Sequence, residues 1–218
     1  ADFIHIVDIS HLPIEQNRGY PYAILFGIPL TPAYNKEVSD TPDYVINRVN
    51  DNYNFDDDEL YLKEIQTDRI SDYMADFLIG KGFNAYSQSD ANQMKTTDFD
   101  GVYGETLLPH KTIASLAGIG WIGRSNLLVT PKYGSAQCLG SILTDAPLQK
   151  TPVRRVRSLC GNCNLCKEVC ETNALKGHTW NKETRREDMI LVHQCTTSMN
   201  CLISCPWTQM YMKTKPRK

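Results

Sequence analysis

Four cysteines stand close together in the run CGNCNLCKEVC, at Cys160, Cys163, Cys166 and Cys170. Their C-x2-C-x2-C-x3-C spacing is the pattern with which bacterial ferredoxins hold [4Fe–4S] clusters. A structural zinc site is the main alternative, but zinc ligands typically come as C-x2-C pairs separated by a longer loop. The run therefore predicts an iron–sulfur site and electron transfer, and the need to wrap a cluster constrains how this part of the chain folds.

A second cysteine run, CTTSMNCLISCPW, lies near the C-terminus. In two-cluster ferredoxins the last cysteine of the first run ligates the other cluster. This crossed rule predicts two clusters, each of which takes cysteine ligands from both runs. The first would take Cys160, Cys163, Cys166 and Cys205, and the second would take Cys170, Cys195 and Cys201.

The second cluster lacks one thiolate, because Ser198 stands where the fourth cysteine of the second run is expected. Three interpretations remain open. Ser198 ligates through its oxygen; or Cys138, His193 or His178 supplies the bond; or the second cluster is a three-iron or labile form. Cys138 itself lies in an apolar run, SAQCLGSIL, and is expected to be a core residue.

Eight cysteines in 218 residues, without a secretory leader pattern in the sequence given, favour an intracellular metal-binding protein over a disulfide framework. We therefore expect the cytoplasm. No apolar run approaches the ~20 residues of a membrane-spanning helix, so no membrane association is expected.

The net charge of −2 conceals an asymmetry along the chain. Residues 1–150 carry 11 basic and 20 acidic side chains, a net −9, whereas residues 151–218 carry 12 and 5, a net +7. The basic residues of the second part either offset an anionic cluster or form a surface for an acidic electron donor or RNA phosphates. They include Arg154, Arg155, Arg157, Lys167, Lys213, Lys215, Arg217 and Lys218.

Hydrophobic patterning predicts an α/β or α+β domain over residues 1–150 and a small ferredoxin-like domain over residues 151–218. Buried strands are expected at residues 3–10 and 22–30, and further strands at 83–90 and within 126–145. Helices are expected from residue 56 to about 78, with a buried apolar stripe, at 110–118, and at 185–193. Residues 31–54 are rich in Pro, Asn and Asp and predict an irregular excursion.

A glycine-rich segment stands at residues 109–148. Gly118, Gly120 and Gly123 bracket Trp121, so that backbone can approach a flat ligand closely. The segment is not a dinucleotide fingerprint, because no strand leads into a G-x-G-x-x-G turn.

Three motifs in fixed order resemble those of the epoxyqueuosine reductases and their short double-cluster relatives. They are AGIGWIGRSNLLVTPKYGS with LGSILTDAPL, then CGNCNLCKEVC, then CPWTQ. The resemblance covers roughly residues 105–210, and the reductive dehalogenases are more distant kin. It implies a corrinoid-binding core related to the nitroreductase-like fold, with a two-cluster module that feeds electrons to the corrinoid cobalt.

The same resemblance implies a cofactor-binding set. The Gly118 to Asn126 loop would lie against the corrinoid, and the end of the strand at Thr144 would lie near its edge. Flavin is the second choice of cofactor. The candidate residues are Gly118, Gly120, Trp121, Gly123, Ser125, Asn126, Thr144 and Asp145.

The chain departs from the family pattern in three places. The Arg-Tyr-Ala stretch followed by Asp-Tyr-His, whose aspartate is the presumed proton donor, has only Asp43-Tyr44 as a fragment here. The helical repeats that help full-length members hold tRNA are not found in these 218 residues. Ser198 replaces a cysteine, and Glu171 stands where proline usually follows Cys170. We therefore expect the fold and the clusters to be shared, but not the tRNA substrate.

The leading hypothesis is an iron–sulfur oxidoreductase that relays low-potential electrons to a corrinoid or flavin and reduces a small molecule or a modified nucleoside. A ferredoxin or flavodoxin would be the external donor. Because a reduced intermediate needs a nearby acid, the candidate catalytic residues are Asp43, Tyr44, His110 and Tyr133. Two alternatives are a non-catalytic electron carrier or reductive activator of a corrinoid or flavin enzyme, and an RNA-binding module that uses the basic tail.

Overall fold

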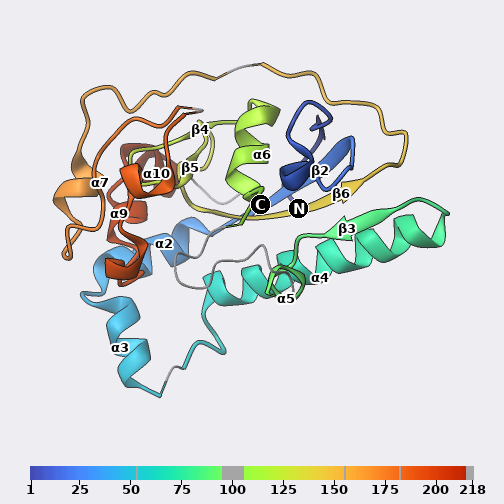
Figure 1. Cartoon of the computed structure of the whole chain (residues 1–218). Helices are drawn as coiled ribbons and strands as arrows, with labels where there is room; N and C mark the ends of the chain where they lie inside the picture. The colour runs from blue at the N-terminus through green and yellow to red at the C-terminus, as the bar shows by residue number, and fades with distance from the viewer. Residues whose placement is uncertain (53, 95–105, 155, 182, 215–218) are drawn as a thin grey trace. The chain divides into compact units, whose positions relative to one another are not determined.

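The structure is a computed structural model that describes residues 1–52, 54–94, 106–154, 156–181 and 183–214 (Figure 1). Four of the basic residues noted above, Arg155, Lys215, Arg217 and Lys218, lie outside the described residues. The strands are β1 (Phe3–Asp8), β2 (Tyr22–Pro29), β3 (Ala85–Ser87), β4 (Trp121–Ile122), β5 (Leu128–Val129) and β6 (Gln137–Thr144). The helices are α1 (Ile14–Asn17), α2 (Pro32–Asp40), α3 (Tyr44–Asn50), α4 (Glu59–Gly80), α5 (Asp90–Gln93), α6 (His110–Ala117), α7 (Leu165–Glu168), α8 (Arg186–Met189), η1 (Val192–Gln194), α9 (Asn200–Ile203) and α10 (Pro206–Met212).

The chain forms two compact units, each built from three separate stretches of sequence. The first unit comprises residues 1–28, 62–119 and 138–155, and the second comprises residues 29–61, 120–137 and 156–218. All seven cysteines of the two runs are in the second unit. The domain boundary predicted after residue 150 stays a prediction.

The first unit is organised around a four-stranded sheet with the order β1-β2-β6-β3. The β1–β2 and β3–β6 pairs are antiparallel, with Phe3 opposite Gly27 and Ala85 opposite Thr144. Strand β2 is buried along almost its whole length, as its continuous apolar sequence predicts. The prediction of a mixed α and β architecture is confirmed, and so are the strands expected at residues 3–10, 22–30 and 83–90.

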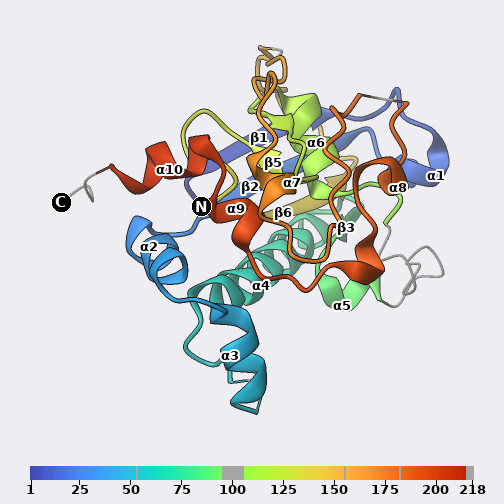
Figure 2. The same cartoon turned by 90° about the vertical axis from the view of Figure 1, so that its left-hand side faces the viewer.

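Two helices of the first unit lie on opposite faces of this sheet (Figures 1 and 2). Helix α4 covers one face, where Ala75 and Leu78 pack against Ile24, Phe26 and Ile142. Helix α6 lies on the other face and ends at Gly118, whose φ of 69° gives the left-handed cap typical of a helix C-terminus. The helices expected near residues 56–78 and 110–118 are thus confirmed.

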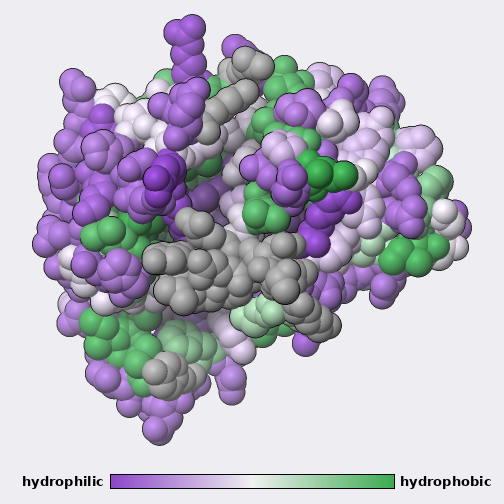
Figure 3. All heavy atoms as spheres, in the orientation of Figure 1, coloured by the Kyte–Doolittle hydropathy of each residue, from purple (hydrophilic) through white to green (hydrophobic). Residues whose placement is uncertain are grey.

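The apolar stripe predicted on α4 is only partly buried, which corrects the expectation that all of it is core. Leu62, Tyr73 and Phe77 are 48%, 72% and 53% exposed. On the face shown in Figure 3, apolar residues are visible at the Gly80 end of α4. The buried residues of the helix are mostly small: Thr67, Ser71, Ala75 and Leu78. Small side chains let the helix approach β6 closely, since a Cβ on Gly140 would lie 2.9 Å from the Ser71 hydroxyl.

Residues 31–54 were expected to be irregular, and this expectation is wrong. They contain α2 and α3. The Thr31 hydroxyl accepts a hydrogen bond from the Tyr34 N–H, and Pro32 occupies the first turn of α2, so the polar residues act as helix-starting signals. The buried face of α2 consists of Tyr34, Asn35 and Val38.

The second unit combines the β4–β5 hairpin with the short helices α7, α9 and α10, and α2 packs against α9 and α10. The two strands expected within residues 126–145 exist as β5 and β6, but they belong to different sheets. The helix expected at residues 185–193 is shorter, because only α8 and η1 form. Within the described part of the chain, no helix combines the length and apolarity needed to cross a membrane.

The close packing around Gly140 in β6 can be tested with two glycine variants. Gly140→Ala would place a Cβ 2.4 Å from the ring of Phe26 in β2, which is fully buried, and 2.9 Å from the Ser71 hydroxyl in α4. We expect this overpacking to lower the free energy of unfolding by about 1–3 kcal/mol in denaturant titrations. The control is Gly80→Ala, where a Cβ meets nothing within 4 Å, and we expect a change within about 0.5 kcal/mol. Equal effects of the two variants would contradict the proposed close packing.

Candidate functional site

None of the eight cysteines, all of which are described, is joined in a disulfide. Cys138 lies in β6 and is 6% exposed, so its prediction as a core residue is confirmed. The other seven are half-buried, apart from the exposed Cys195.

The structure brings together the four cysteines assigned to the first cluster. Cys160 and Cys163 stand in a turn closed by a Cys163 N–H to Cys160 O hydrogen bond of 2.9 Å, Cys166 lies in α7, and Cys205 caps α10. Burial, followed by the negative charges of Cys160, Cys205 and Cys163, raises the pKa of the Cys166 thiol to about 11. The other three thiols are therefore close enough for their charges to disfavour ionisation of Cys166.

The three cysteines assigned to the second cluster also interact. Burial raises the pKa of the Cys201 thiol to about 12, with further contributions from the charges of Cys195, Cys166 and Cys170. The Thr197 N–H donates to the Cys195 sulfur at 3.4 Å. Because Cys166 also interacts with Cys201, the two groups of cysteines adjoin each other.

The eighth ligand stays open. Ser198 is half-buried and lies between Thr197 and Met199, which both have left-handed backbone conformations, with φ of 54° and 64°. His178 and His193 are exposed. Ser198, His178 and His193 therefore all stay predictions for this position.

The donor set suits a cationic iron–sulfur core. Cys166 and Cys201, whose pKa values are raised, ionise readily only when positive charge is placed beside them, which iron supplies. N–H donors to cysteine sulfur are also present, from Trp121 and Thr197. In the described residues, no group of three or more His, Cys, Asp or Glu side chains converges tightly enough to hold a single metal ion. Ligands of a cubane surround a larger object and bind different iron atoms, so their arrangement differs from that of a single-ion site.

Two residues of the glycine-rich segment contact the first cysteine run. The Trp121 indole N–H donates to the Cys160 sulfur at 3.3 Å. The Arg124 guanidinium donates to the Asn164 side chain at 2.5 Å and to the Gly161 carbonyl at 2.8 Å. Sequence reasoning placed Trp121 against a corrinoid and did not select Arg124. The only available signal was their place in the GWIGR motif.

The glycines around Trp121 are explained by packing within the chain. A Cβ on Gly118 would lie 2.5 Å from the Arg154 carbonyl oxygen, and one on Gly120 would lie 2.2 Å from that of Val129. These positions need glycine without any ligand. Their part in cofactor binding stays a prediction, as it does for Gly123 and for the buried Ser125 and Asn126.

Thr144 and Asp145 both hydrogen-bond to Asn84. The Thr144 hydroxyl donates to the Asn84 carbonyl at 2.8 Å, and the Asp145 carboxylate accepts from the Asn84 backbone N–H and side-chain amide at 2.8 and 2.7 Å. This arrangement ties the end of β6 to the start of β3. A role of Thr144 and Asp145 at a corrinoid edge stays a prediction.

Tyr44 belongs to a polar cluster in the second unit. Its hydroxyl and that of Tyr34 donate to the same Asp58 carboxylate oxygen, at 3.0 and 2.9 Å, and Asp58 is 3% exposed. Burial first, and then the hydrogen bond with Asp58, raises the pKa of Tyr44 to about 12. Asp43 is exposed and precedes α3 in a left-handed conformation. Tyr44 therefore keeps its proton, which it directs at Asp58.

A cavity of about 280 Å³ adjoins this cluster. It is lined by Thr31, Ala33, Tyr34, Glu37, Tyr44, Arg48, Asp57 and Glu59. Its polar groups hydrogen-bond to one another, since Arg48 donates to Asp57 and Glu59 accepts from Thr31.

Tyr133, another candidate catalytic residue, is 5% exposed, and its ring packs edge-on against that of Tyr211 with centroids 5.3 Å apart.

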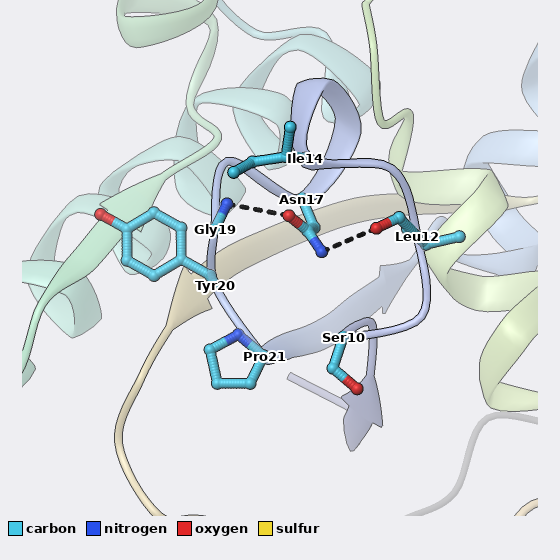
Figure 4. A pocket seen from close by; sticks show the side chains of 7 residues that line it. All are labelled: Ser10, Leu12, Ile14, Asn17, Gly19, Tyr20 and Pro21. Atoms are coloured by element: carbon cyan, nitrogen blue, oxygen red, sulfur yellow. Dashed lines mark hydrogen bonds between the residues drawn. The ribbon is translucent and has the colours of Figure 1, made fainter.

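A second cavity of about 280 Å³ lies in the first unit, beside α1 (Figure 4). The Asn17 side chain crosses it and bonds to the Gly19 N–H and the Leu12 carbonyl. These bonds hold the loop between β1 and β2. None of the predicted site residues lines this cavity.

His110 stands at the end of a hydrogen-bonded chain in the first unit. The Gln88 amide donates to the Leu108 carbonyl at 2.9 Å, so its oxygen faces Ser141 and accepts the Ser141 hydroxyl proton at 2.6 Å. The Ser141 oxygen, 2.8 Å from His110 Nδ1, must then accept from the imidazole. His110 is therefore protonated at Nδ1, and Nε2 carries the lone pair. Burial lowers the pKa of His110 to about 4, which favours the neutral ring at neutral pH.

This network predicts the titration of His110. In ¹⁵N-histidine NMR spectra we expect the Nδ1–H tautomer at pH 7 and protonation only well below pH 6, because burial penalises the charged ring. The associated stability should be complete above the unfolded pKa of about 6.5 and should be lost as the pH falls toward 4.

Ser141→Ala removes the acceptor at Nδ1, and we expect a shift toward the Nε2–H tautomer in the same spectra. The signal of exposed His178 should be the same in both proteins and is the internal reference. An Nε2–H tautomer of His110 in the unaltered protein would contradict the hydrogen-bond assignment.

No family model matches the chain. It is nevertheless similar to curated epoxyqueuosine reductases. The protein of Listeria monocytogenes is 45% identical over 65 residues, which are 30% of this chain and 17% of that protein. The protein of a Synechococcus strain is 34% identical over 121 residues, which are 49% of this chain and 37% of that protein. The sequence resemblance to epoxyqueuosine reductases is thus confirmed, and the chain matches less than two fifths of the length of these two relatives.

Solved structures show the same likeness in fold. Epoxyqueuosine reductase from Bacillus subtilis has a TM-score of 0.55 at 15% identity, covering 95% of this chain and 62% of that one. A reductive dehalogenase whose structure suggests a mechanism for B12-dependent dehalogenation has a TM-score of 0.63 at 18% identity, covering 95% of this chain and 30% of that one. At these identities the likeness concerns the fold alone.

Proposed function

We propose that this chain, whose sequence relatives are epoxyqueuosine reductases, is an iron–sulfur oxidoreductase. It would take low-potential electrons from a ferredoxin or flavodoxin and relay them through two [4Fe–4S] clusters to a corrinoid, or to a flavin as the second choice. The observation that carries this proposal is the grouping of seven thiols in the second unit, with Cys166 beside Cys160, Cys163 and Cys205, and Cys201 beside Cys170 and Cys195.

This grouping of the thiols is the one that crossed ligation requires. The comparisons supply further support. The sequence identity to epoxyqueuosine reductases and the likeness in fold to reductive dehalogenases favour a corrinoid-binding core related to the nitroreductase-like fold.

The cysteines, Trp121 and the candidate proton donors would have separate roles. The cysteines would hold the clusters, which supply one-electron transfer when bound, while Trp121 would donate a hydrogen bond to Cys160. His110, with its lone pair on Nε2, suits the role of acceptor better than that of acid at neutral pH. Asp43, Tyr44 and Tyr133 stay candidates for a proton donor, although the proton of Tyr44 is directed at Asp58.

The substrate proposed is a small molecule or a modified nucleoside, because nothing in the described residues identifies a tRNA surface. Reduced thiols fit a reducing compartment, so we propose that the reaction takes place in the cytoplasm. A ferredoxin-like domain over residues 151–218 remains part of this proposal.

Anaerobic reconstitution with iron, sulfide and cobalamin tests the function. We expect about eight irons per chain, four for each cubane, and a corrinoid spectrum that survives desalting. About seven irons would indicate a three-iron second cluster. If the protein assembles clusters but takes up neither corrinoid nor flavin, the result would contradict the enzyme hypothesis and support an electron carrier or reductive activator.

Cysteine variants test the ligand assignment. Cys205→Ala should abolish the electron paramagnetic resonance signal of one reduced cluster, and Cys195→Ala should abolish that of the other, because each removes a ligand from a different group. Cys138→Ala is the matched control and should keep the full iron content, since this thiol is buried in β6. Loss of the same signal in the first two variants would contradict crossed ligation.

A further inference from the structure

The β4–β5 hairpin presents an indole N–H to the sulfur of Cys160. Trp121 is 3% exposed and donates to this sulfur at 3.3 Å. Its ring also packs edge-on against Trp207, with centroids 5.3 Å apart and an interplanar angle of 79°. Trp207 lies two residues after Cys205, so Trp121 contacts both chain segments that supply ligands to the first cluster.

The position of Trp121 is rigidly determined. It pairs with Val129 across the β4–β5 hairpin, and the preceding Gly120 lies so close to the Val129 carbonyl that no side chain fits. The indole therefore has little freedom to leave Cys160. A hydrogen bond from a fixed donor keeps a constant geometry, so it can orient a metal ligand and tune the metal site.

Arg124, in the loop of the same hairpin, also hydrogen-bonds to the first cysteine run. Its two terminal nitrogens hold the Gly161 carbonyl and the Asn164 side chain, which both stand between Cys160 and Cys166. Its Nε atom is buried and has no hydrogen-bond partner in the described residues. A buried N–H without a partner is costly, and a cluster sulfide would satisfy it.

We propose that Trp121 and Arg124 are positioning residues that raise the reduction potential of the first cluster by donating hydrogen bonds and positive charge to it. The inference rests on the proposed function, because it takes Cys160 to be a cluster ligand. It assigns the GWIGR segment a task distinct from seating a corrinoid.

The physical reason is the difference in charge between the two redox states. Reduction adds an electron to an already anionic cluster, and hydrogen bonds to its sulfur atoms stabilise the more negative state more strongly. A nearby guanidinium acts in the same direction. Burial of the indole keeps the hydrogen bond of Trp121 away from water, which would weaken it.

The decisive variant is Trp121→Phe, which removes the N–H donor and keeps an aromatic ring. Redox titration of the reconstituted protein, followed by electron paramagnetic resonance, measures the midpoint potentials of both clusters. We expect the potential of the first cluster, identified by its loss in Cys205→Ala, to shift to a more negative value. The potential of the second cluster should stay unchanged.

Trp207→Phe is the matched control. It alters the other ring of the same aromatic pair, but the indole N–H of Trp207 makes no hydrogen bond to a cysteine in the described residues. We expect no comparable shift. Iron content and far-UV circular dichroism of both variants should match the unaltered protein, which separates tuning from loss of structure.

Two substitutions of Arg124 separate charge from geometry. Arg124→Lys keeps the charge but loses the forked donors, and Arg124→Met loses both. We expect Arg124→Met to shift the first potential to a more negative value and to accelerate loss of iron to a chelator. Arg124→Lys should shift the first potential less than Arg124→Met does, because the charge is kept. It should still lose iron to the chelator faster than the unaltered protein, because the forked donors are lost.

The outcomes distinguish this inference from the function on which it rests. If the unaltered protein assembles no cluster, both are overturned. If clusters assemble normally but Trp121→Phe leaves both potentials unchanged, or shifts them as Trp207→Phe does, only the inference fails. A shift confined to the second cluster would also overturn it.

Discussion

The second unit groups seven thiols, of which Cys166 and Cys201 lie beside the negative charges of several others. Burial and neighbouring negative charge raise the pKa values of Cys166 and Cys201 well above that of an ordinary thiol. A bound cationic core would reverse this penalty and convert repulsion into ligation. Folding of the second unit and cluster assembly are therefore expected to be coupled, because the same atoms take part in both.

The β4–β5 hairpin links the most distinctive motif of the sequence to this thiol-rich region. Its glycine positions are required by close backbone contacts, and its Trp121 and Arg124 side chains engage the loop between Cys160 and Cys166. The motif is thus used for packing and for contact with Cys160, a predicted metal ligand. Its role as a binding surface for a flat cofactor stays a prediction, which the resemblance to known enzymes favours.

Much of the fold could be predicted from periodicity. The continuous apolar run of β2 and the glycine-terminated pattern of α6 were sufficient, because burial on both faces and a helix cap each leave a local mark. The prediction for α2 was wrong because Lys36, Glu37 and Asp40 lie on an exposed helical face, where polar composition resembles that of a loop. The stripe of α4 was misjudged because close packing against Gly140 favours small residues, and hydrophobicity alone does not reveal that choice.

The sequence by itself predicted the type of chemistry, because cysteine spacing along a short run dictates which thiols can reach one cluster. It also identified the family resemblance. Only the tertiary structure put the Trp121 N–H on the Cys160 sulfur and gave His110 its tautomer through Ser141 and Gln88. Those contacts join residues about 30 to 50 positions apart, and their direction depends on how strands and helices pack, which spacing along the chain does not encode.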